Sequence, residues 1–480
     1  MELRWYRRNQ EVVAQALERG ARPDMATTMA SGPLDELVAL HDELGVLAAL
    51  DSLNPQRKRE GIDDRLLLRT LAVMPFLECH SFTGAAELLF QDPAILLHLG
   101  WSPFQIRMGD SERHRSPRGR QRVSLPCNPE TLRDELGRIS EADWLKLQQQ
   151  AVAEIVRWGF VRGGVFAIDG SGLGKNLRLV SLTCVSTQRP LKVAWRLLEG
   201  DASEKGKEAA VTRSLLQQAR ALGIEIELLL VDALYADGPF LAWCKYVMGI
   251  DVLVPIPSDR ELHHDLEQLA KAGSLSFQRH SYVRTIQGHK QRRTLELGAQ
   301  SGCTSWDSFV EAAKGHGAQS PCLWACLIRP VDPTSKDDLP WTLVSTRNWV
   351  SGVAAFESFR PRWHIENGEF RELKEGWGLE AQRWGRNIEV QRGRVTLTCL
   401  AFNTAQIYLT QRGSNIAAHG IRRIRRLYHD QLGHSPVVIF LGHYYAVFPV
   451  EELLRLINRT ARQSLRPALG QPSQASPRGP

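Results

Sequence analysis

Two aspartates each directly follow an apolar run of the chain. Asp169 comes after residues 165–168 (Val-Phe-Ala-Ile), and Asp232 comes after the wholly apolar end of residues 226–231. In open α/β sheets, ligands bind at the carboxyl ends of the strands, because the loops there are free to diverge. Carboxylates at that edge can share hard cations such as Mg²⁺, which keeps water and phosphate oxygens as its other ligands. One such aspartate would more often cap a turn, but two of them favour a metal site.

Glu366 is the third candidate ligand, on a helix predicted from about residue 353 to residue 376. The residues on or near its face of that helix are Phe359, Arg362, Trp363 and Phe370. If this face meets the sheet edge, Glu366 completes a three-carboxylate site and Arg362 lies beside the substrate backbone. The alternative is an ordinary amphipathic helix, in which Arg362 and Glu366 form an i, i+4 pair worth only a few tenths of a kcal/mol.

Apolar patterns predict the elements that must position these acids. The expected order is strand 165–168, strand 179–185, strand 191–198, helix 204–223, strand 226–231, helix 239–248 and strand 252–255. Three consecutive strands followed by alternating helices and strands are typical of a mixed sheet with helices on its faces. This order predicts an α/β fold with a ribonuclease H-like core that lacks only its final helix.

A chain of 480 residues is too long to fold around one compact core. We therefore expect further regions around the predicted core. Polar, alternating segments predict a β-rich insertion, and a long apolar helix is expected after Arg386. An all-helical N-terminal region and a helical, basic C-terminal region flank the core. The predicted domains are 1–160 (helical, DNA-binding), 161–257 (first part of the core), 258–345 (insertion), 346–412 (second part of the core, with the Glu helix) and 413–480 (Arg-rich, with a disordered end).

Three short segments give the chain its resemblance to insertion-sequence transposases of the DDE type, in the cut-and-paste branch with a Y-R-E-K signature. They are Ala167-Ile168-Asp169-Gly170-Ser171, Val231-Asp232-Ala233-Leu234-Tyr235 and Arg362-Trp363-His364-Ile365-Glu366-Asn367. The third segment is the most specific, and the resemblance covers about residues 61–412. It implies a ribonuclease H-like fold, two divalent cations and DNA movement that often passes through hairpinned ends.

The resemblance also implies roles for individual residues. Asp169, Asp232 and Glu366 match the metal-binding acids, whereas Arg362 and Trp363 match groups that hold the DNA strand end. Tyr235 matches a looser motif position that is also expected near DNA. Two positions depart from the signature: its tyrosine falls on Phe359, and its lysine, expected seven residues after the glutamate, falls on Leu373. Lys374 is the nearest lysine, and an ideal helix places it about 80° from the face of Glu366.

Two metal ions roughly 3.5–4 Å apart can position a nucleophilic oxygen and stabilise the leaving oxygen of a phosphodiester. We therefore expect two Mg²⁺ ions, replaceable by Mn²⁺, with Asp169 bridging them and the other two acids each holding one side. The expected reaction is cleavage of transposon ends and joining of their 3′-hydroxyls to target DNA. The expected partners are double-stranded DNA (terminal repeats and target) and a second copy of the chain, in a homodimer on paired ends.

Two arginine-rich segments are candidates for phosphate binding. The net charge is +7, and residues 412–480 carry ten Arg, no Lys and three acids. Residues 107–122 carry six Arg against two acids in a turn-rich segment. The arginines expected to bind terminal repeats are Arg113, Arg115, Arg118, Arg120 and Arg122. The tail arginines Arg422, Arg423, Arg425 and Arg426 are expected to contact the DNA backbone or to help pair two protomers. Solvated charged faces are the alternative.

Composition excludes several classes of protein. Hydrophobic residues make up 43% and charged residues 24%, which excludes a mostly disordered or fibrous chain. No apolar run approaches the roughly 20 residues that span a bilayer, and the N-terminus lacks a secretory signal. We therefore expect no membrane partner and a bacterial cytoplasmic, nucleoid-associated protein. The eight cysteines form no C-x-x-C pair, so we expect reduced, buried thiols rather than zinc ligands.

Three other functions fit parts of the sequence. A ribonuclease H-like endonuclease would use the same metals without strand transfer. A catalytically inactive DNA-binding derivative would fit the two departures from the signature. Nucleotide binding through residues 170–175 is weak, because the segment lacks the G-x-x-x-x-G-K-[ST] spacing.

Overall fold

The structure is a computed structural model in two compact units, residues 1–154 with 373–480 and residues 155–372. It describes the chain apart from residues 1–6, 29–32, 56–60, 78, 80, 91, 109–124, 175, 201–204, 287–288, 332–338, 365–368, 381–384, 386, 412–420, 423, 426–435 and 457–480. Glu366 and the five candidate arginines between residues 113 and 122 lie outside the described residues.

A mixed nine-stranded sheet forms the centre of the second unit, in the order β5-β4-β3-β6-β7-β11-β10-β9-β8. Its strands are β3 (Gly163–Gly172), β4 (Leu177–Cys184), β5 (Leu191–Glu199), β6 (Glu225–Leu230), β7 (Asp251–Ile256), β8 (Phe277–Ile286), β9 (His289–Cys303), β10 (Leu323–Pro330) and β11 (Trp341–Ser345). The strands β3, β4 and β5 are antiparallel neighbours, whereas β6 and β7 continue parallel to β3. Residues 228–230 of β6 and 252–254 of β7 are buried on both faces, which explains the apolar runs there, whereas Glu225 and Glu227 in the first half of β6 are exposed.

The predicted order of the core elements is confirmed. All five expected core strands occur within a few residues of their predicted positions, and the two expected helices lie between them. Residues 258–345 contain β8, β9, β10 and β11, and these strands belong to the same sheet as the core strands. β11 pairs with β7, and β10, β9 and β8 follow outward, so the insertion widens the core sheet. The alternating patterns of residues 258–345 predict that strands form there. They do not predict that β11 pairs with β7, because these two strands are distant in the sequence.

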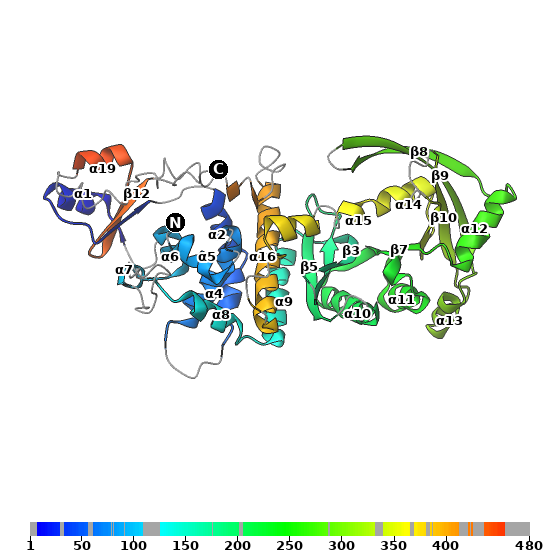
Figure 1. Cartoon of the computed structure of the whole chain (residues 1–480), viewed down its shortest axis with the longest axis horizontal. Coiled ribbons are helices and arrows are strands. Elements are labelled where there is room, and N and C mark those ends of the chain that lie inside the picture. The colour runs from blue at the N-terminus through cyan, green and yellow to red at the C-terminus, as the bar shows by residue number, and fades with distance from the viewer. Residues whose placement is uncertain are drawn as a thin grey trace, which may run out of the picture. The chain divides into compact units, whose positions relative to one another are not determined.

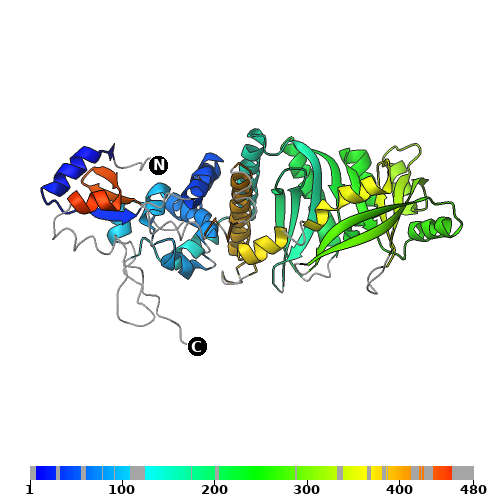
Figure 2. The ribbon, with the colours of Figure 1, turned by 90° about the horizontal axis from the view of Figure 1, so that it is seen from above.

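Helices cover both faces of this sheet. They are α10 (Lys205–Ala221), η2 (Ala233–Tyr235), α11 (Gly238–Trp243), η3 (Cys244–Met248), α12 (Glu261–Lys271), α13 (Asp307–Gly315), α14 (Gly352–Phe359) and α15 (Pro361–His364). Figure 1 shows α10 and α11 on one side of the core strands and α14 and α15 on the other. Seen from above in Figure 2, the yellow segment with α14 and α15 runs across the strands. The chain leading toward residue 366 therefore passes over one face of the sheet.

The described residues of the helix predicted from residue 353 to residue 376 are helical, but they do not form one regular α-helix. α14 ends at Phe359 and α15 starts at Pro361, which has no backbone N–H to donate to the preceding turn. Arg360 between them keeps helical dihedral angles, with φ of −55° and ψ of −36°. Further along, η5 (Glu372–Gly376) is a π-helix, which has a wider turn than an α-helix. The α-helical angle expected between Glu366 and Lys374 is therefore not valid here, because the backbone between them is not one regular α-helix.

The first unit has a helical bundle around one long buried helix, α16 (Ile388–Gln411). The other helices of this bundle region are α2 (Pro33–Glu43), α3 (Val46–Asp51), α4 (Asp64–Val73), η1 (Met74–Leu77), α5 (Phe82–Glu87), α6 (Pro93–Leu99), α7 (Pro103–Met108), α8 (Pro129–Leu136) and α9 (Glu141–Arg157), whose last three residues belong to the second unit. The predicted apolar helix after Arg386 is α16, and it packs against α2, α4 and α8. Nearly every residue from Val390 to Leu409 is buried, so the helix has no polar face.

The first unit also holds a sheet, contrary to the expected all-helical N-terminal region and helical C-terminal region. β1 (Arg7–Arg8) pairs with β13 (Tyr444–Phe448), and β2 (Met25–Thr28) pairs with β12 (Val437–Leu441). β12 and β13 form a hairpin through Gly442, whose φ of 59° suits glycine. The helices α1 (Gln10–Glu18) and α19 (Val450–Leu456) share its apolar core. The prediction failed because the strands are short, and because β1 and β2 pair with β13 and β12, which lie more than 400 residues away in the sequence.

Candidate active site

Strand register brings Asp169 and Asp232 to the same level of the sheet. β3 and β6 are parallel neighbours, and their last paired residues are Ala167 and Leu230. Each aspartate lies two residues beyond that pair, on strands that are about 4.8 Å apart in such sheets. Asp232 lies just beyond the end of β6, whereas Asp169 lies inside β3, which continues to Gly172 alongside β4. Both aspartates follow the last β3–β6 pair at the same distance.

Asp169 is nearly buried, with 5% of its surface exposed. The backbone N–H of Gly170 donates to its Oδ1 at 2.8 Å, and Nη1 of Arg362 lies 3.6 Å from its Oδ2. Arg362 is itself only 8% exposed. Arg362, from α15, is therefore beside Asp169, so β3 and the segment that crosses over the sheet both contribute charged groups at this place.

Asp232 begins the short helix η2 and is half-buried. Its Oδ1 accepts a hydrogen bond from the backbone N–H of Leu234 at 2.9 Å. Capping of this kind was the structural alternative to a metal role. A carboxylate oxygen can accept more than one bond, so the cap is compatible with a ligand role for Asp232.

Tyr235 is the last residue of η2, and burial and nearby carboxylates raise the pKa of its phenol. Burial raises the pKa of its phenol, negative charge on Glu208 raises it further, and Asp232 and Asp169 add smaller effects. The buried phenol therefore stays protonated. That hydroxyl donates to Oε2 of Glu208 at 3.3 Å, and Tyr235 is only 3% exposed. In this structure it faces the protein, and its predicted DNA contact stays a prediction.

The two ends of the segment that contains Glu366 are both attached to the sheet near Asp169. On one side Arg362 lies beside Asp169. On the other side Glu369 forms a fully buried ion pair with Lys192 of β5 and accepts a hydrogen bond from Thr183 of β4 at 3.4 Å. Lys192 also donates to Ser181, which is the register partner of Asp169, at 3.0 Å. The ends therefore bracket the sheet face on which Asp169 lies.

The other residues predicted to touch DNA differ in exposure. Phe359 is buried at 1% exposure, against the rings of Trp363 and Trp341. Trp363 and Lys374 are half-buried. Their DNA contacts stay predictions. Arg425, by contrast, is 5% exposed and donates to the backbone carbonyls of Phe76, Gly376 and Pro75, so it is not available for the expected phosphate contact.

The donor chemistry fits a hard divalent cation. Asp169 and Asp232 offer carboxylate oxygens from adjacent strands, which is what Mg²⁺ and Mn²⁺ prefer. Among the residues that the structure describes, no cluster of three His, Cys, Asp or Glu side chains forms a metal site, and Glu366 is outside that set.

Six of the eight cysteines are buried, while Cys303 is partly exposed and Cys322 is exposed. Burial raises the pKa of Cys326 to about 12, which keeps this thiol protonated.

Four residues of this region gave no usable signal in the sequence. From the sequence alone, Glu208 and Arg178 are expected to be surface charges on a helix and a strand. Lys192 lies in an alternating strand, whose pattern predicts an exposed side chain at this position. Glu369 lies on the predicted Glu helix without any distinguishing spacing. Their partners are fixed only by the sheet order, so single-sequence patterns could not pair them.

The mixed sheet with helices on its faces is consistent with a ribonuclease H-like transposase domain. Residues 179–404 match the family model described as a transposase DDE domain, which supports a DDE-type transposase family and a transposase function in general. The matched segment begins after Asp169 and contains Asp232 and Glu366. No curated protein matches the chain. In the described part of the chain, no helix has the length and apolar character needed to cross a membrane.

Proposed function

We propose that this protein is a DNA transposase that cuts transposon ends and joins their 3′-hydroxyls to target DNA. The observation that carries the proposal is the register of β3 and β6, which puts Asp169 and Asp232 at one level with Arg362 against Asp169. The family match makes DNA the expected partner. A homodimer on paired ends, acting in the bacterial cytoplasm at the nucleoid, completes the proposal.

Asp169, Asp232 and Glu366 would hold two Mg²⁺ ions, or Mn²⁺ in their place. DDE transposases generally depend on divalent metal. Bound there, the ions would supply charge stabilisation for the attacking and leaving oxygens of the phosphodiester. Support for the position of Glu366 comes from its flanks, because Arg362 and Glu369 attach to neighbouring parts of one sheet face.

The protein's own cations and rings would orient the DNA strand. The guanidinium of Arg362 can hold a phosphate oxygen by paired hydrogen bonds beside the carboxylates. Trp363 offers a half-buried ring for the strand end. Phe359 has no hydroxyl, so it can support Trp363 by edge-to-face packing, with 6.0 Å between ring centroids, but cannot bond a phosphate. Lys374 is proposed as the substitute for the signature lysine. No covalent protein–DNA intermediate is required.

A strand-transfer assay separates the proposed transposase from an endonuclease with the same fold. Pre-cut DNA carrying the ends that flank the gene is incubated with the protein, a target plasmid and Mg²⁺. Joined products are expected, because a freed 3′-hydroxyl can act as the nucleophile at the same site. Cleavage of uncut ends without any joined product would favour the endonuclease, and neither reaction would favour an inactive DNA-binding derivative.

Binding of the ends should depend strongly on salt if the five arginines from residue 113 to residue 122 contact phosphates. Each neutralised phosphate contributes a slope of about −0.9 in log affinity against log salt, so five contacts predict a roughly 500-fold loss between about 50 and 200 mM salt. Changing all five to Gln should remove most of this dependence in a fluorescence-anisotropy titration. The matched control changes the same five to Lys, which keeps the charges and should keep the slope. A salt slope unchanged in the Gln variant contradicts the assignment.

A further inference from the structure

Glu208 is a nearly buried carboxylate on α10, behind the strands that carry the two aspartates. It is 8% exposed and forms an ion pair with Arg178 of β4. Neither residue belongs to the set expected to bind metal or DNA. A buried charge is costly unless its partners are well placed. The groups that Glu208 and Arg178 contact therefore indicate the role of this ion pair.

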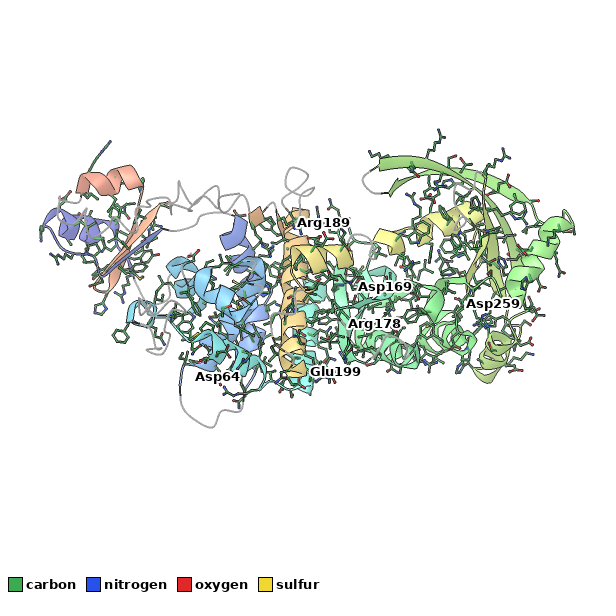
Figure 3. All side chains as sticks on the ribbon, in the orientation of Figure 1. Asp64, Asp169, Arg178, Arg189, Glu199 and Asp259 are labelled. Carbon is green, nitrogen blue, oxygen red and sulfur yellow. The ribbon has the colours of Figure 1, made fainter. Side chains whose placement is uncertain are left out.

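One side of the pair supports the peptide next to Asp169. Nη2 of Arg178 donates to the carbonyl of Gly170 at 3.2 Å. A Cβ added to Gly170 would lie 2.7 Å from Nε of Arg178 and 3.1 Å from Oε2 of Glu208. The pair therefore lies directly against residue 170, which has no side chain to keep it away. Figure 3 labels Asp169 and Arg178, which come from the neighbouring strands β3 and β4.

The other side of Glu208 holds the turn that Asp232 begins. Its Oε2 accepts the hydroxyl proton of Tyr235 at 3.3 Å. Tyr235 is the last residue of η2, and Asp232 caps the same three-residue helix through the N–H of Leu234. A shift of Tyr235 would therefore move the backbone that directs Asp232.

A link of this kind is needed because the ladder between β3 and β6 ends before the aspartates. The last paired residues are Ala167 and Leu230, and β6 ends at Leu230. Beyond that point, backbone pairing between the two strands does not set the spacing of Asp169 and Asp232. Contacts from Glu208 reach the chain next to both aspartates, at Gly170 through Arg178 and at η2 through Tyr235.

We propose that Glu208 is a positioning residue, which sets the separation of the Asp169 and Asp232 carboxylates through Arg178 and Tyr235. The inference rests on the proposed function, because it assumes that these two aspartates bind a divalent cation. Groups behind metal ligands commonly change metal affinity by about 10- to 100-fold when they are removed. Glu208 is expected to act in this range without touching the metal.

Mn²⁺ binding to the full-length protein, measured by electron paramagnetic resonance without DNA, tests this directly. Glu208→Ala should weaken Mn²⁺ binding about 10- to 100-fold, and Glu208→Gln should recover part of the loss because its amide oxygen can still accept from Tyr235. Tyr235→Phe removes only the hydroxyl that reaches Glu208 and should weaken binding by a smaller factor. Gln217→Ala, at an exposed position on the same helix, should bind Mn²⁺ like the wild type.

The outcomes separate the inference from the proposed function. If wild-type Mn²⁺ binding is absent, or is unchanged by Asp169→Asn, the proposed function fails. If Asp169→Asn abolishes binding but folded Glu208→Ala binds Mn²⁺ like the wild type, the inference alone is overturned. Should Glu208→Ala fail to fold, Tyr235→Phe decides: weaker binding supports the link, and unchanged binding overturns it.

Discussion

Asp169→Asn, Asp232→Asn and Glu366→Gln are each expected to abolish DNA strand cleavage while binding of end DNA stays largely intact. Each change keeps the shape of the side chain and removes the charge that a divalent cation needs. We expect a loss of at least about 10³-fold in cleavage rate, which corresponds to about 4 kcal/mol of transition-state stabilisation. Nicking of a supercoiled plasmid that carries the element's ends measures cleavage, and a gel-shift titration in Ca²⁺ measures binding.

Glu225→Gln is the matched control for these three variants. Glu225 is exposed at the start of β6, the opposite end of the strand that Asp232 follows. The Glu225→Gln variant should cleave DNA like the wild type, because position 225 is remote from Asp169 and Asp232. If two of the three acid variants still cut DNA at the wild-type rate, the site is assigned to the wrong residues.

Lys192→Met and Glu369→Gln are expected to destabilise the second unit by about 3–5 kcal/mol each. The pair is fully buried between β5 and the segment after residue 368, and Lys192 also lies 4.9 Å from the ring centroid of Phe370. Removing one partner leaves an uncompensated charge in the core, which is the costly case for a buried ion pair. For a unit of this size, the loss lowers the melting temperature by about 10 °C.

The double variant Lys192→Met/Glu369→Met gives the sharpest version of this test. Replacing both charges with apolar groups of similar size removes the desolvation cost together with the attraction, so most of the lost stability should return. As a control, Arg279→Met breaks an ion pair with Glu296 in which the arginine is 72% exposed, and should cost less than about 1 kcal/mol. Stability is measured by differential scanning calorimetry. If Lys192→Met and Glu369→Gln are as stable as Arg279→Met, the buried ion pair does not contribute the expected stability.

Local patterns were sufficient for the core of the second unit. The apolar runs before Asp169 and Asp232 predicted strands at these places, and the structure contains them as β3 and β6. Pro361 was a local signal for the break between α14 and α15, but the strong apolar face on either side favoured one long helix. Pro361 removes one backbone hydrogen bond between α14 and α15, while Arg360 keeps helical dihedral angles, so the amphipathic pattern still continues past the proline.

Contacts distant in sequence were not predictable in the same way. β12 and β13 pair with strands near the N-terminus, and the side chain of Gln10 bonds the carbonyl of Val447 at 2.9 Å. For the site, the link from Glu208 to both strand ends depends on how α10 lies on the sheet. No spacing in one sequence encodes such partners, so they required the structure.

The most direct test of the whole account is a crystal structure of the full-length protein with Mn²⁺, using anomalous scattering to locate the ions. We expect Mn²⁺ held by carboxylate oxygens of Asp169 and Asp232, with Glu366 brought to the same ions from the segment between Arg362 and Glu369. Manganese bound elsewhere, or Glu366 on a surface remote from the ends of β3 and β6, would contradict the proposed chemistry.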